Sequence, residues 1–208
     1  MRLVCISDTH GLHDQVTLPP GDVLVHAGDF TSEGELEDVR AFLDWFGGVG
    51  SFGWRVLIAG NHDLSFEHLP EVVEPLIPAA VTYLNDSGVS IGGMQFWGSP
   101  VTPYFFGWAF NRREREIEQH WNLIPAGTDV LVTHGPPFQI RDSVGPGRES
   151  VGCPHLARAV TRVRPRLHVF GHIHEGYGSH HQAGTHYLNA AICDADYRVA
   201  QQPVVVDL

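Results

Sequence analysis

Aspartate, asparagine and histidine side chains recur in five short motifs, and each motif follows a short apolar run. The motifs are Asp8-Thr9-His10, His26-Ala27-Gly28-Asp29, Gly60-Asn61-His62-Asp63, Thr133-His134-Gly135-Pro136 and Gly171-His172-Ile173-His174. Carboxylate, amide and imidazole groups are the ligands that borderline or hard divalent metals such as manganese, iron and zinc prefer. One such motif can occur by chance, but five in succession predict a metal site. Because none contains a cysteine, a closed structural zinc site is not expected.

The apolar runs before the motifs are typical of buried strands. They cover residues 3–6, 23–25, 56–58, 130–132 and 167–170. Each run is short and rich in β-branched or aromatic residues, and its hydrophobicity is continuous, which indicates a strand covered on both faces. Ligands of open α/β sheets bind beyond the carboxyl ends of the strands. We therefore expect the five motifs to meet at one edge.

Amphipathic segments between these runs predict helices. In residues 33–46 apolar side chains recur at three- and four-residue intervals, and Ser32 with Glu35 resembles a capping box at the start. A second helix is expected over residues 111–121, with Asn111 and then Glu114 at its start. A third helix is expected to begin near Pro154.

The C-terminal part has a different pattern. Residues 186–189 and 203–207 are typical of strands joined by turns, and the Gly- and Pro-rich stretch 143–154 is interpreted as a long functional loop. With no internal repeat and no low-complexity linker, the pattern predicts one α/β domain over residues 1–208.

Composition limits the partners. The chain is 43% hydrophobic and carries a net charge of −11, so a long nucleic acid is not expected to bind. No apolar run is long enough to span a bilayer, and the first residues lack the pattern of a secretory signal, so we expect a cytoplasmic protein without membrane contact. The oligomeric state is not predicted. Three widely separated cysteines, Cys5, Cys153 and Cys193, are interpreted as buried thiols.

The motifs together resemble the calcineurin-like metallophosphoesterase superfamily. The succession is DTH, HAGD, GNHD, THGP and GHIH, and it extends over nearly the whole chain. The longer segments HAGDFT, WNLIPAGTDVLVTHGPP, GHIHEGYG and YLNAA are similar to a small subfamily of metallophosphoesterase-domain proteins of animal brain and bacteria. The resemblance implies a four-layer α/β/β/α sandwich.

The resemblance also implies two divalent metal ions (Mn, Fe or Zn) and a role for each residue. The first metal would be held by Asp8, His10 and His174, the second by Asn61, His134 and His172, and Asp29 would bridge both. His62 would face the substrate, with Asp63 orienting its ring. Some members of the subfamily have glycine where this chain has His172, so a full second site is expected here.

Phosphoester hydrolysis follows from this arrangement. A metal-bridging hydroxide is expected to attack phosphorus, and His62 is expected to protonate the leaving alkoxide, a task that suits a side chain titrating near neutrality. The predicted substrates are small phosphodiesters such as cyclic nucleotides. A phosphomonoesterase, a protein phosphatase and a non-catalytic metal-binding scaffold are the alternatives.

Several residues keep two interpretations. His26 is interpreted as a hydrogen-bonded support rather than a ligand. Arg141 and Arg148 flank the long loop and either grip a phosphate or stay solvated. Residues 104–108, Tyr-Phe-Phe-Gly-Trp, are interpreted as core packing, with stacking on a nucleobase as the alternative. The other histidines are assigned to the surface or to packing: His13, His68, His120, His155, His168, His180, His181 and His186.

Overall fold

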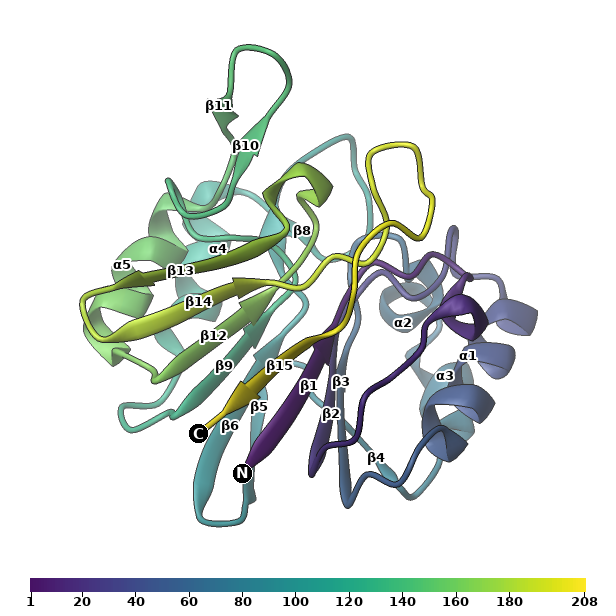
Figure 1. The fold of residues 1–208 in the computed structure, drawn as a ribbon. Helices are drawn as coiled ribbons and strands as arrows, with labels where there is room; N and C mark the ends of the chain where they lie inside the picture. The colour runs from purple at the N-terminus through teal and green to yellow at the C-terminus, as the bar shows by residue number, and fades with distance from the viewer.

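Two β-sheets lie face to face at the centre of the protein, as the computed structural model shows for residues 1–208 (Figure 1). In spatial order, the first sheet contains β15 (Val204–Asp207), β1 (Arg2–Ile6), β2 (Val23–Ala27), β3 (Trp54–Ile58) and β4 (Val81–Tyr83). The second contains β13 (Gly178–Gln182), β14 (Thr185–Asn189), β12 (Leu167–Phe170), β9 (Val130–Thr133), β6 (Met94–Ser99) and β5 (Ser87–Ile91). Strands β1 to β4 are parallel, as are β14, β12, β9 and β6, whereas β15, β13 and β5 pair antiparallel at the sides.

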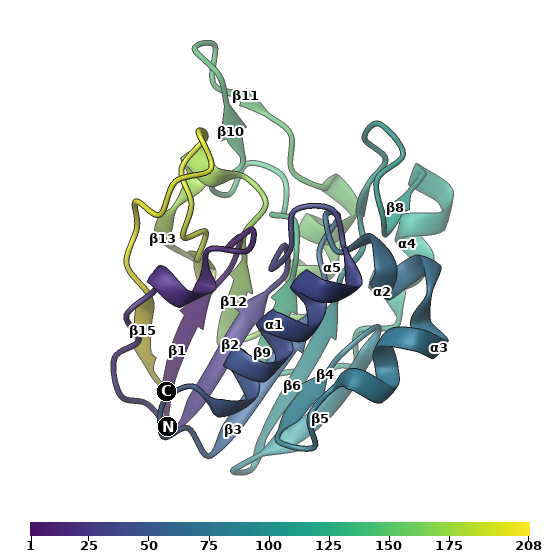
Figure 2. The same ribbon diagram turned by 90° about the vertical axis from the view of Figure 1, so that its right-hand side faces the viewer.

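Helices cover the outer face of each sheet (Figure 2). On the first sheet lie α1 (Leu36–Gly48), α2 (Leu64–His68) and α3 (Pro70–Val73). On the second lie α4 (Glu114–Asn122) and α5 (Pro154–Val163). Single 3-10 turns are η1 (His13–Gln15), η2 (Glu74–Leu76) and η3 (His174–Gly176). None of the helices is both long and apolar enough to pass through a membrane.

Two short ribbons stand apart from the main sheets. One pairs β7 (Thr102–Pro103) with β8 (Asn111–Arg112), and the other pairs β10 (Ser143–Val144) with β11 (Glu149–Ser150). The β10–β11 hairpin projects from the end of the molecule where the central strands finish (Figure 1). The stretch that the sequence assigned to a long loop therefore contains a small hairpin.

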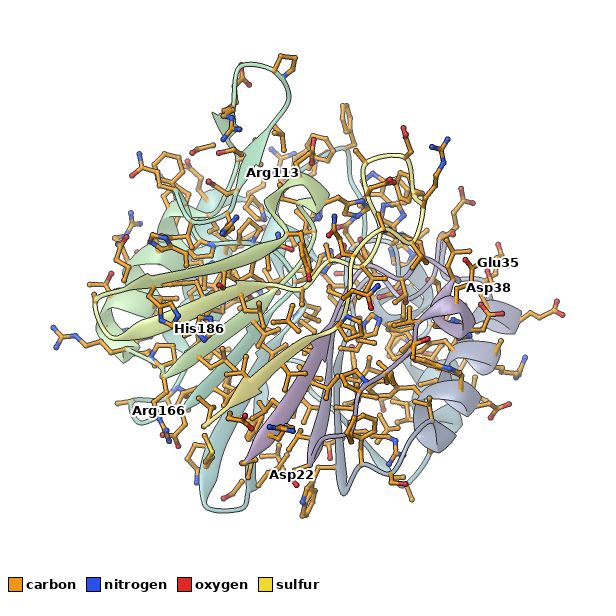
Figure 3. The ribbon with its side chains drawn as sticks, in the orientation of Figure 1. Asp22, Glu35, Asp38, Arg113, Arg166 and His186 are labelled. Carbon is orange, nitrogen blue, oxygen red and sulfur yellow. The ribbon has the colours of Figure 1, made fainter.

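Alternation along the strands builds three apolar layers. In β1, Leu3 and Cys5 belong to the core between the sheets, whereas Val4 and Ile6 pack toward α1. Both faces are fully buried, which explains the continuous apolar runs, and each buried Val or Leu side chain stabilises the fold by about 1.5–3 kcal/mol. Charged side chains such as Glu35, Asp38 and Arg166 lie outside these layers (Figure 3). The four-layer α/β/β/α arrangement is confirmed.

The predicted capping box at Ser32 and Glu35 is wrong, and the second helix starts later than predicted. Helix α1 begins at Leu36, because Glu35 is still extended (φ −60°, ψ 136°), and the Ser32 hydroxyl donates to the His10 carbonyl at 3.4 Å instead of capping. The residue at 111 belongs to β8, and α4 starts after Arg113, whose N–H donates to Glu116 at 3.2 Å. In each case the polar side chain near the helix start is used by a contact outside the helix.

The five motif-bearing strands end at the same end of the molecule, although they come from two sheets (Figure 1). Strands β1, β2 and β3 end in the first sheet, and β9 and β12 end in the second. An isolated bridge between Ser7 and Ala191 links the two sheets there. The Gly171 N–H donates to the His134 carbonyl at 2.9 Å, which fixes two of the motifs to each other.

Candidate metal centre

Four of the candidate ligands have a backbone conformation that residues other than glycine rarely adopt. The φ angles are 54° at Asp8, 41° at His10, 57° at Asp29 and 66° at His172. Such residues cost on the order of 1–3 kcal/mol each and persist where surrounding contacts hold them. Here the Asp8 N–H donates to the Gly28 carbonyl at 2.9 Å, and the His10 N–H donates to the Asp29 carbonyl at 3.1 Å. The strained turns direct these side chains toward one another.

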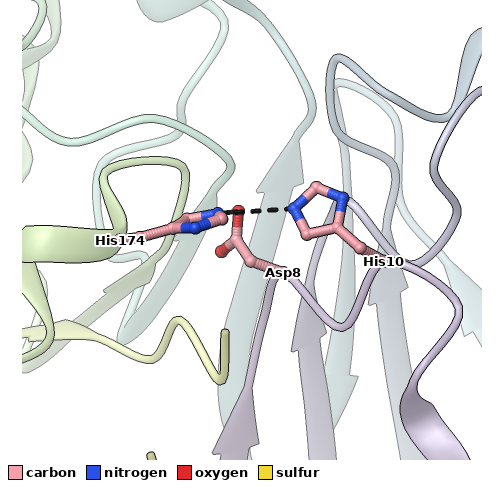
Figure 4. Close-up of side chains that lie close together, drawn as sticks. All are labelled: Asp8, His10 and His174. Atoms are coloured by element: carbon pink, nitrogen blue, oxygen red, sulfur yellow. Dashed lines mark hydrogen bonds and ion pairs between the residues drawn. The ribbon is translucent and has the colours of Figure 1, made fainter. Parts of the chain in front are cut away.

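Asp8, His10 and His174 form the first cluster (Figure 4). The Nε2 atoms of the two histidines lie 3.3 Å apart, and His174 Nε2 lies 3.5 Å from an oxygen of Asp8. Each imidazole donates its Nδ1–H to a backbone carbonyl, that of Thr31 for His10 (3.3 Å) and that of Asp194 for His174 (2.7 Å). Both Nε2 atoms are thereby left to accept.

Asp29, His134, His172 and Asn61 form the second cluster. The Nε2 atom of His134 lies 3.1 Å from an Asp29 oxygen and 2.9 Å from the Asn61 side-chain oxygen. The Nδ1–H of His134 donates to the Ala27 carbonyl at 2.9 Å. The ring of His172 lies 5.0 Å from that of His134, and one nitrogen or oxygen of each of Asp29, His134 and His172 falls within 4.8 Å of the others.

Asp29 connects the two clusters. Its carboxylate also lies within 4.8 Å of His10 and His62, and His10 belongs to the first cluster. The other Asp29 oxygen accepts the His62 N–H at 2.8 Å. All seven predicted ligands therefore converge on one place, and Asp29 has the central position that a bridging carboxylate needs.

The clusters attract positive charge. Burial acts to raise the pKa of Asp8, but the hydrogen bond from His174 and the charge of His134 lower it to about 2. Burial acts to lower the pKa of His134, yet the charge and hydrogen bond of Asp29 raise it to about 9. The pKa of His174 is likewise raised to about 9, against burial, by its hydrogen bond to Asp8. Burial acts to raise the pKa of Asp29 as well, but the charge and hydrogen bond of His134 hold it below its ordinary value. The buried carboxylates of Asp8 and Asp29 thus stay ionised and require cations beside them.

This arrangement fits divalent metals. Several acceptor atoms face inward within each cluster. The opposite nitrogens of His10, His134 and His174 donate to carbonyls, which is how protein imidazoles are oriented toward a metal. Nitrogen and oxygen ligands without sulfur suit manganese, iron or zinc. The residues present therefore fit a pair of such ions, with protons on His134 and His174 as the competing cations.

A family model described as calcineurin-like phosphoesterase matches residues 1–176 of the chain. The chain belongs to this family. Metallophosphoesterase domain-containing protein 1 of Homo sapiens is 42% identical over 232 aligned residues, which cover 100% of the chain and 71% of that protein. The Mus musculus protein of the same name has the same identity and coverage. The protein is accordingly a metal-dependent phosphoester hydrolase of a family that uses two metal ions.

Solved structures share the fold of this calcineurin-like phosphoesterase. Phosphopantetheinyl hydrolase from Mycobacterium tuberculosis has a TM-score of 0.65 at 16% identity, covering 94% of this chain and 90% of that one. The protein TT1561 of Thermus thermophilus has a TM-score of 0.56 at 14% identity, covering 90% and 88%. At these identities the likeness concerns the fold alone.

His62 of this phosphoesterase lies at the edge of the clusters, but the group that orients its ring is not the one predicted. Its Nδ1–H donates to the Ser32 carbonyl at 2.7 Å, and its ring lies 4.3 Å from that of Trp108. The expectation that Asp63 orients this ring is wrong. The fully buried Asp63 carboxylate instead accepts four hydrogen bonds from groups at and near Asp29. The donors are Asp29 N–H, Thr31 N–H, Thr31 Oγ1–H and Gly60 N–H, at 2.8–2.9 Å. Asp63 therefore positions Asp29.

A cavity of about 540 Å³ opens beside the clusters. His62 reaches it together with several of the predicted metal ligands, namely His10, Asp29, Asn61, His172 and His174. The rest of the lining contains aromatic and apolar side chains and one carboxylate, Glu175, but no arginine or lysine. A substrate in this cavity would meet the metals at one side and flat apolar surfaces at the other.

The packing interpretation of residues 104–108 is wrong. Tyr104, Phe105 and Phe106 are 52%, 57% and 83% exposed, and Tyr104, Phe105 and Trp108 line the cavity. The chain turns here between β7 and β8. Of the aromatic side chains only Trp108 is partly covered, and its ring lies tilted against that of His62. These aromatic side chains are therefore accessible to a ligand in the cavity.

Arg141 does not point at the centre. Its guanidinium donates to the carbonyls of Tyr177 and Ser179, which fastens the loop after β9 to β13. Arg148 is exposed on the projecting β10–β11 hairpin, and it is not among the cavity-lining residues. Neither arginine lines the cavity.

The interpretation of His26 is confirmed. The side chain is fully buried, its Nε2 lies 3.1 Å from the Thr9 hydroxyl, and its Nδ1 accepts the Gly28 N–H at 3.2 Å. It therefore braces the turns that carry Asp8 and Asp29. The three cysteines are buried and free, as expected.

The sequence interpretation missed Asp194 and Tyr197. Asp194 supplies the carbonyl that holds His174, and Tyr197 lines the cavity. A signal was present, since both residues follow β14, whose parallel pairing with β12 brings its carboxyl end to the same edge as the five motifs. Unlike the five motif-bearing strands, β14 is not followed by one of the motifs that indicate metal ligands.

Proposed function

We propose that this protein hydrolyses phosphodiesters of small molecules, with cyclic nucleotides, including the 2′,3′-cyclic forms, among its substrates. The observation that carries the proposal is the lining of the cavity, which contains members of both clusters and His62 but no arginine or lysine. Two metal ions of the manganese, iron or zinc type would be held by Asp8, His10, His174, Asn61, His134, His172 and Asp29.

Charge favours a diester over a monoester. A phosphomonoester carries about −1.5 to −2 charges at pH 7, whereas a diester carries one. The cavity offers no guanidinium or ammonium group for a second negative charge, and it places Glu175 among its walls. The net charge of −11 likewise opposes long polyanions, so a small, singly charged ester is the best match.

When bound, two divalent ions would activate a water and neutralise charge on the phosphate oxygens. The residues of the chain have separate tasks. Asp29 stands between the clusters and is fixed by the His62 N–H and, through its own N–H, by Asp63. The Ser32 carbonyl fixes the Nδ1–H of His62, so that Nε2 is the atom that can give a proton to the leaving oxygen.

The test uses paired substrates. The protein loaded with Mn²⁺ should hydrolyse an aryl phosphodiester with kcat/KM at least about tenfold above that for the matching aryl phosphomonoester, and a chelator should abolish both activities. The same assay with 2′,3′- and 3′,5′-cyclic nucleotides ranks the biological substrates. A reversed preference would favour a phosphomonoesterase. No turnover with manganese, iron or zinc would favour a scaffold protein.

A further inference from the structure

A compact turn joins the metal centre to the mouth of the cavity. Asp194 accepts the Nδ1–H of His174 on its carbonyl at 2.7 Å. Its carboxylate accepts the N–H groups of Asp196 and Arg198, both at 3.0 Å, and its own N–H donates to the Arg198 carbonyl at 2.9 Å. One residue therefore orients a metal ligand and folds the turn that follows.

Tyr197 is the side chain that this turn presents. Its φ angle is 58°, in the left-handed region, and its N–H donates to the Asp194 carbonyl at 2.9 Å. The residue is 51% exposed, so burial in the core does not explain its place. The ring stands edge-on to His10 at 4.8 Å and to His174 at 5.3 Å, and it lies 6.2 Å from His62. Tyr197 thus overlies the first cluster beside the proposed proton donor.

A second aromatic group reaches the same cavity from a distant part of the chain. Trp108 lies 4.3 Å from His62 at an interplanar angle of 31°, and Tyr104 and Phe105 continue this wall. Arg113 lies over the Tyr104 ring at 4.5 Å, which holds that ring at the rim. In Figure 2 the loop between β7 and β8 and the yellow C-terminal loop stand on opposite sides of the strand ends. The cavity therefore has aromatic residues from two loops.

We propose that Tyr197 and the Trp108 wall form a slot for a flat aromatic ring of the substrate, and that Tyr197 determines this specificity. The inference rests on the proposed function, because it names the part of the ester that lies next to the scissile phosphate. Aromatic rings bind flat rings of any substituent pattern by stacking, so a nucleobase and a simple aryl group share the required chemistry. The absence of cationic side chains from the lining favours such a neutral ring over a second phosphate.

Binding to the Mn²⁺-loaded protein tests the slot without requiring turnover. Calorimetry compares adenosine 5′-monophosphate with ribose 5-phosphate, which lacks the base, and phenyl phosphate with methyl phosphate, which lacks the ring. The ring-bearing member of at least one pair should bind about 5- to 150-fold more tightly. The two pairs distinguish a nucleobase from a simple aryl ring.

Variants assign the preference to Tyr197. Tyr197→Ala should remove most of the difference in affinity between the ring-bearing ligand and its ringless partner, and it should leave the affinity for ribose 5-phosphate or methyl phosphate unchanged. Tyr197→Phe should retain the difference in affinity. Phe106→Ala is the matched control, because Phe106 is 83% exposed and does not line the cavity. Equal weakening of both members by Tyr197→Ala, or no difference in the unmodified protein, would overturn the slot.

Asp194 gives an independent variant. Asp194→Ala removes the carboxylate that folds the turn but keeps the backbone carbonyl that holds His174. Asp194→Ala should therefore lose the preference for ring-bearing ligands, as Tyr197→Ala does, while elemental analysis still finds two metals. Asp194→Asn should retain the ring preference and the two metals. An Asp194→Ala protein with full ring preference would contradict the role of the turn. A protein that prefers ring-bearing ligands but hydrolyses no diester would support the slot and contradict the proposed function. A protein that hydrolyses diesters without any ring preference would support the proposed function and contradict the slot.

Discussion

His10 and His174 direct their Nε2 atoms at each other across 3.3 Å, although the residues are 164 positions apart. Each ring has already given its Nδ1–H to a carbonyl, so these two nitrogens and the Asp8 carboxylate form a set of acceptors that is stable only around a cation. Metal binding should therefore stabilise the fold. At 100 times Kd one bound ion contributes about 2.7 kcal/mol, which corresponds to a Tm increase of roughly 5–11 °C for a chain of this size.

Differential scanning calorimetry with and without Mn²⁺ or Zn²⁺ measures this increase. The double variant His10→Ala, His174→Ala is the control, since it should keep only the response of the second cluster. A Tm that responds to neither ion in the unmodified protein would contradict the metal centre.

Replacing Asp29 by asparagine should prevent the paired binding of metal. Asp29 is within reach of both clusters, and its carboxylate is the only charged side chain shared between them. Asparagine has one oxygen instead of two and no charge, so it cannot serve two ions together. Elemental analysis should find at most one metal per chain in Asp29→Asn, and two retained metals would show that the clusters are filled independently.

His62→Ala should keep both metals and slow turnover of esters with poor leaving groups by about 10²–10⁴-fold. The reason is that His62 faces the cavity with Nδ1 committed to Ser32, so its loss removes a proton donor and leaves the ligands that form the two clusters in place. Activated aryl esters, whose leaving group needs no proton, should be affected much less. Equal losses on both kinds of ester would assign His62 to metal or phosphate binding.

The sequence predicts the ligand set because parallel strands covered on both faces have a distinctive pattern. The continuous apolar runs before Asp8, Asn61 and His134 identify strands. The residues that follow each strand then lie at the carboxyl edge of the sheet, where ligands bind. The assignment of these strands to two sheets came only from the family resemblance, since a run of apolar residues does not reveal its neighbours.

Other parts of the fold and of the site could not be predicted from residue patterns. Strand β5 alternates between exposed and covered positions over only five residues, and Ser87–Ile91 contains a glycine, so it lacks a clear strand signal. The ring of His62 is held by a backbone carbonyl, that of Ser32, which no side-chain pattern encodes. Tyr197 reaches the cavity from a turn in which its own backbone is left-handed and in which the Asp194 carboxylate accepts a backbone N–H, and no sequence motif encodes this turn.

His168 should make the protein sensitive to acid. It is fully buried, its Nε2 lies 2.8 Å from the Thr133 hydroxyl, and burial alone lowers its pKa to about 3. The Thr133 hydroxyl donates to the Gly135 carbonyl at 2.8 Å, so His168 is the donor to Thr133 and remains neutral in the fold. An unfolded histidine has a pKa of about 6.5. Between about pH 6.5 and pH 3 the unfolded chain therefore binds a proton that the folded protein does not.

Stability from this residue is present above pH 6.5 and falls by up to about 1.4 kcal/mol for each pH unit below it. His168→Gln keeps a donor for Thr133 but does not titrate, so its free energy of unfolding should fall less between pH 7 and pH 5. Urea unfolding at both pH values measures this, with the exposed His68→Gln as the control. A His168→Gln protein with the same acid sensitivity as the unmodified protein would show that other buried groups govern it.

Gly171→Ala should damage the metal centre without altering any ligand. A methyl group at this position would overlap the Asp8 carboxylate and the Ser7 hydroxyl, because the backbone of the β12 turn passes directly against the end of β1. Inserting a methyl into such a contact typically costs about 1–3 kcal/mol, and here the displaced group is the Asp8 carboxylate of the first cluster. Gly147→Ala is the matched control, since a methyl there meets open space. Relative to that control, Gly171→Ala should have a lower Tm and bind less metal; equal values for both variants would mean that Asp8 can move without loss of the site.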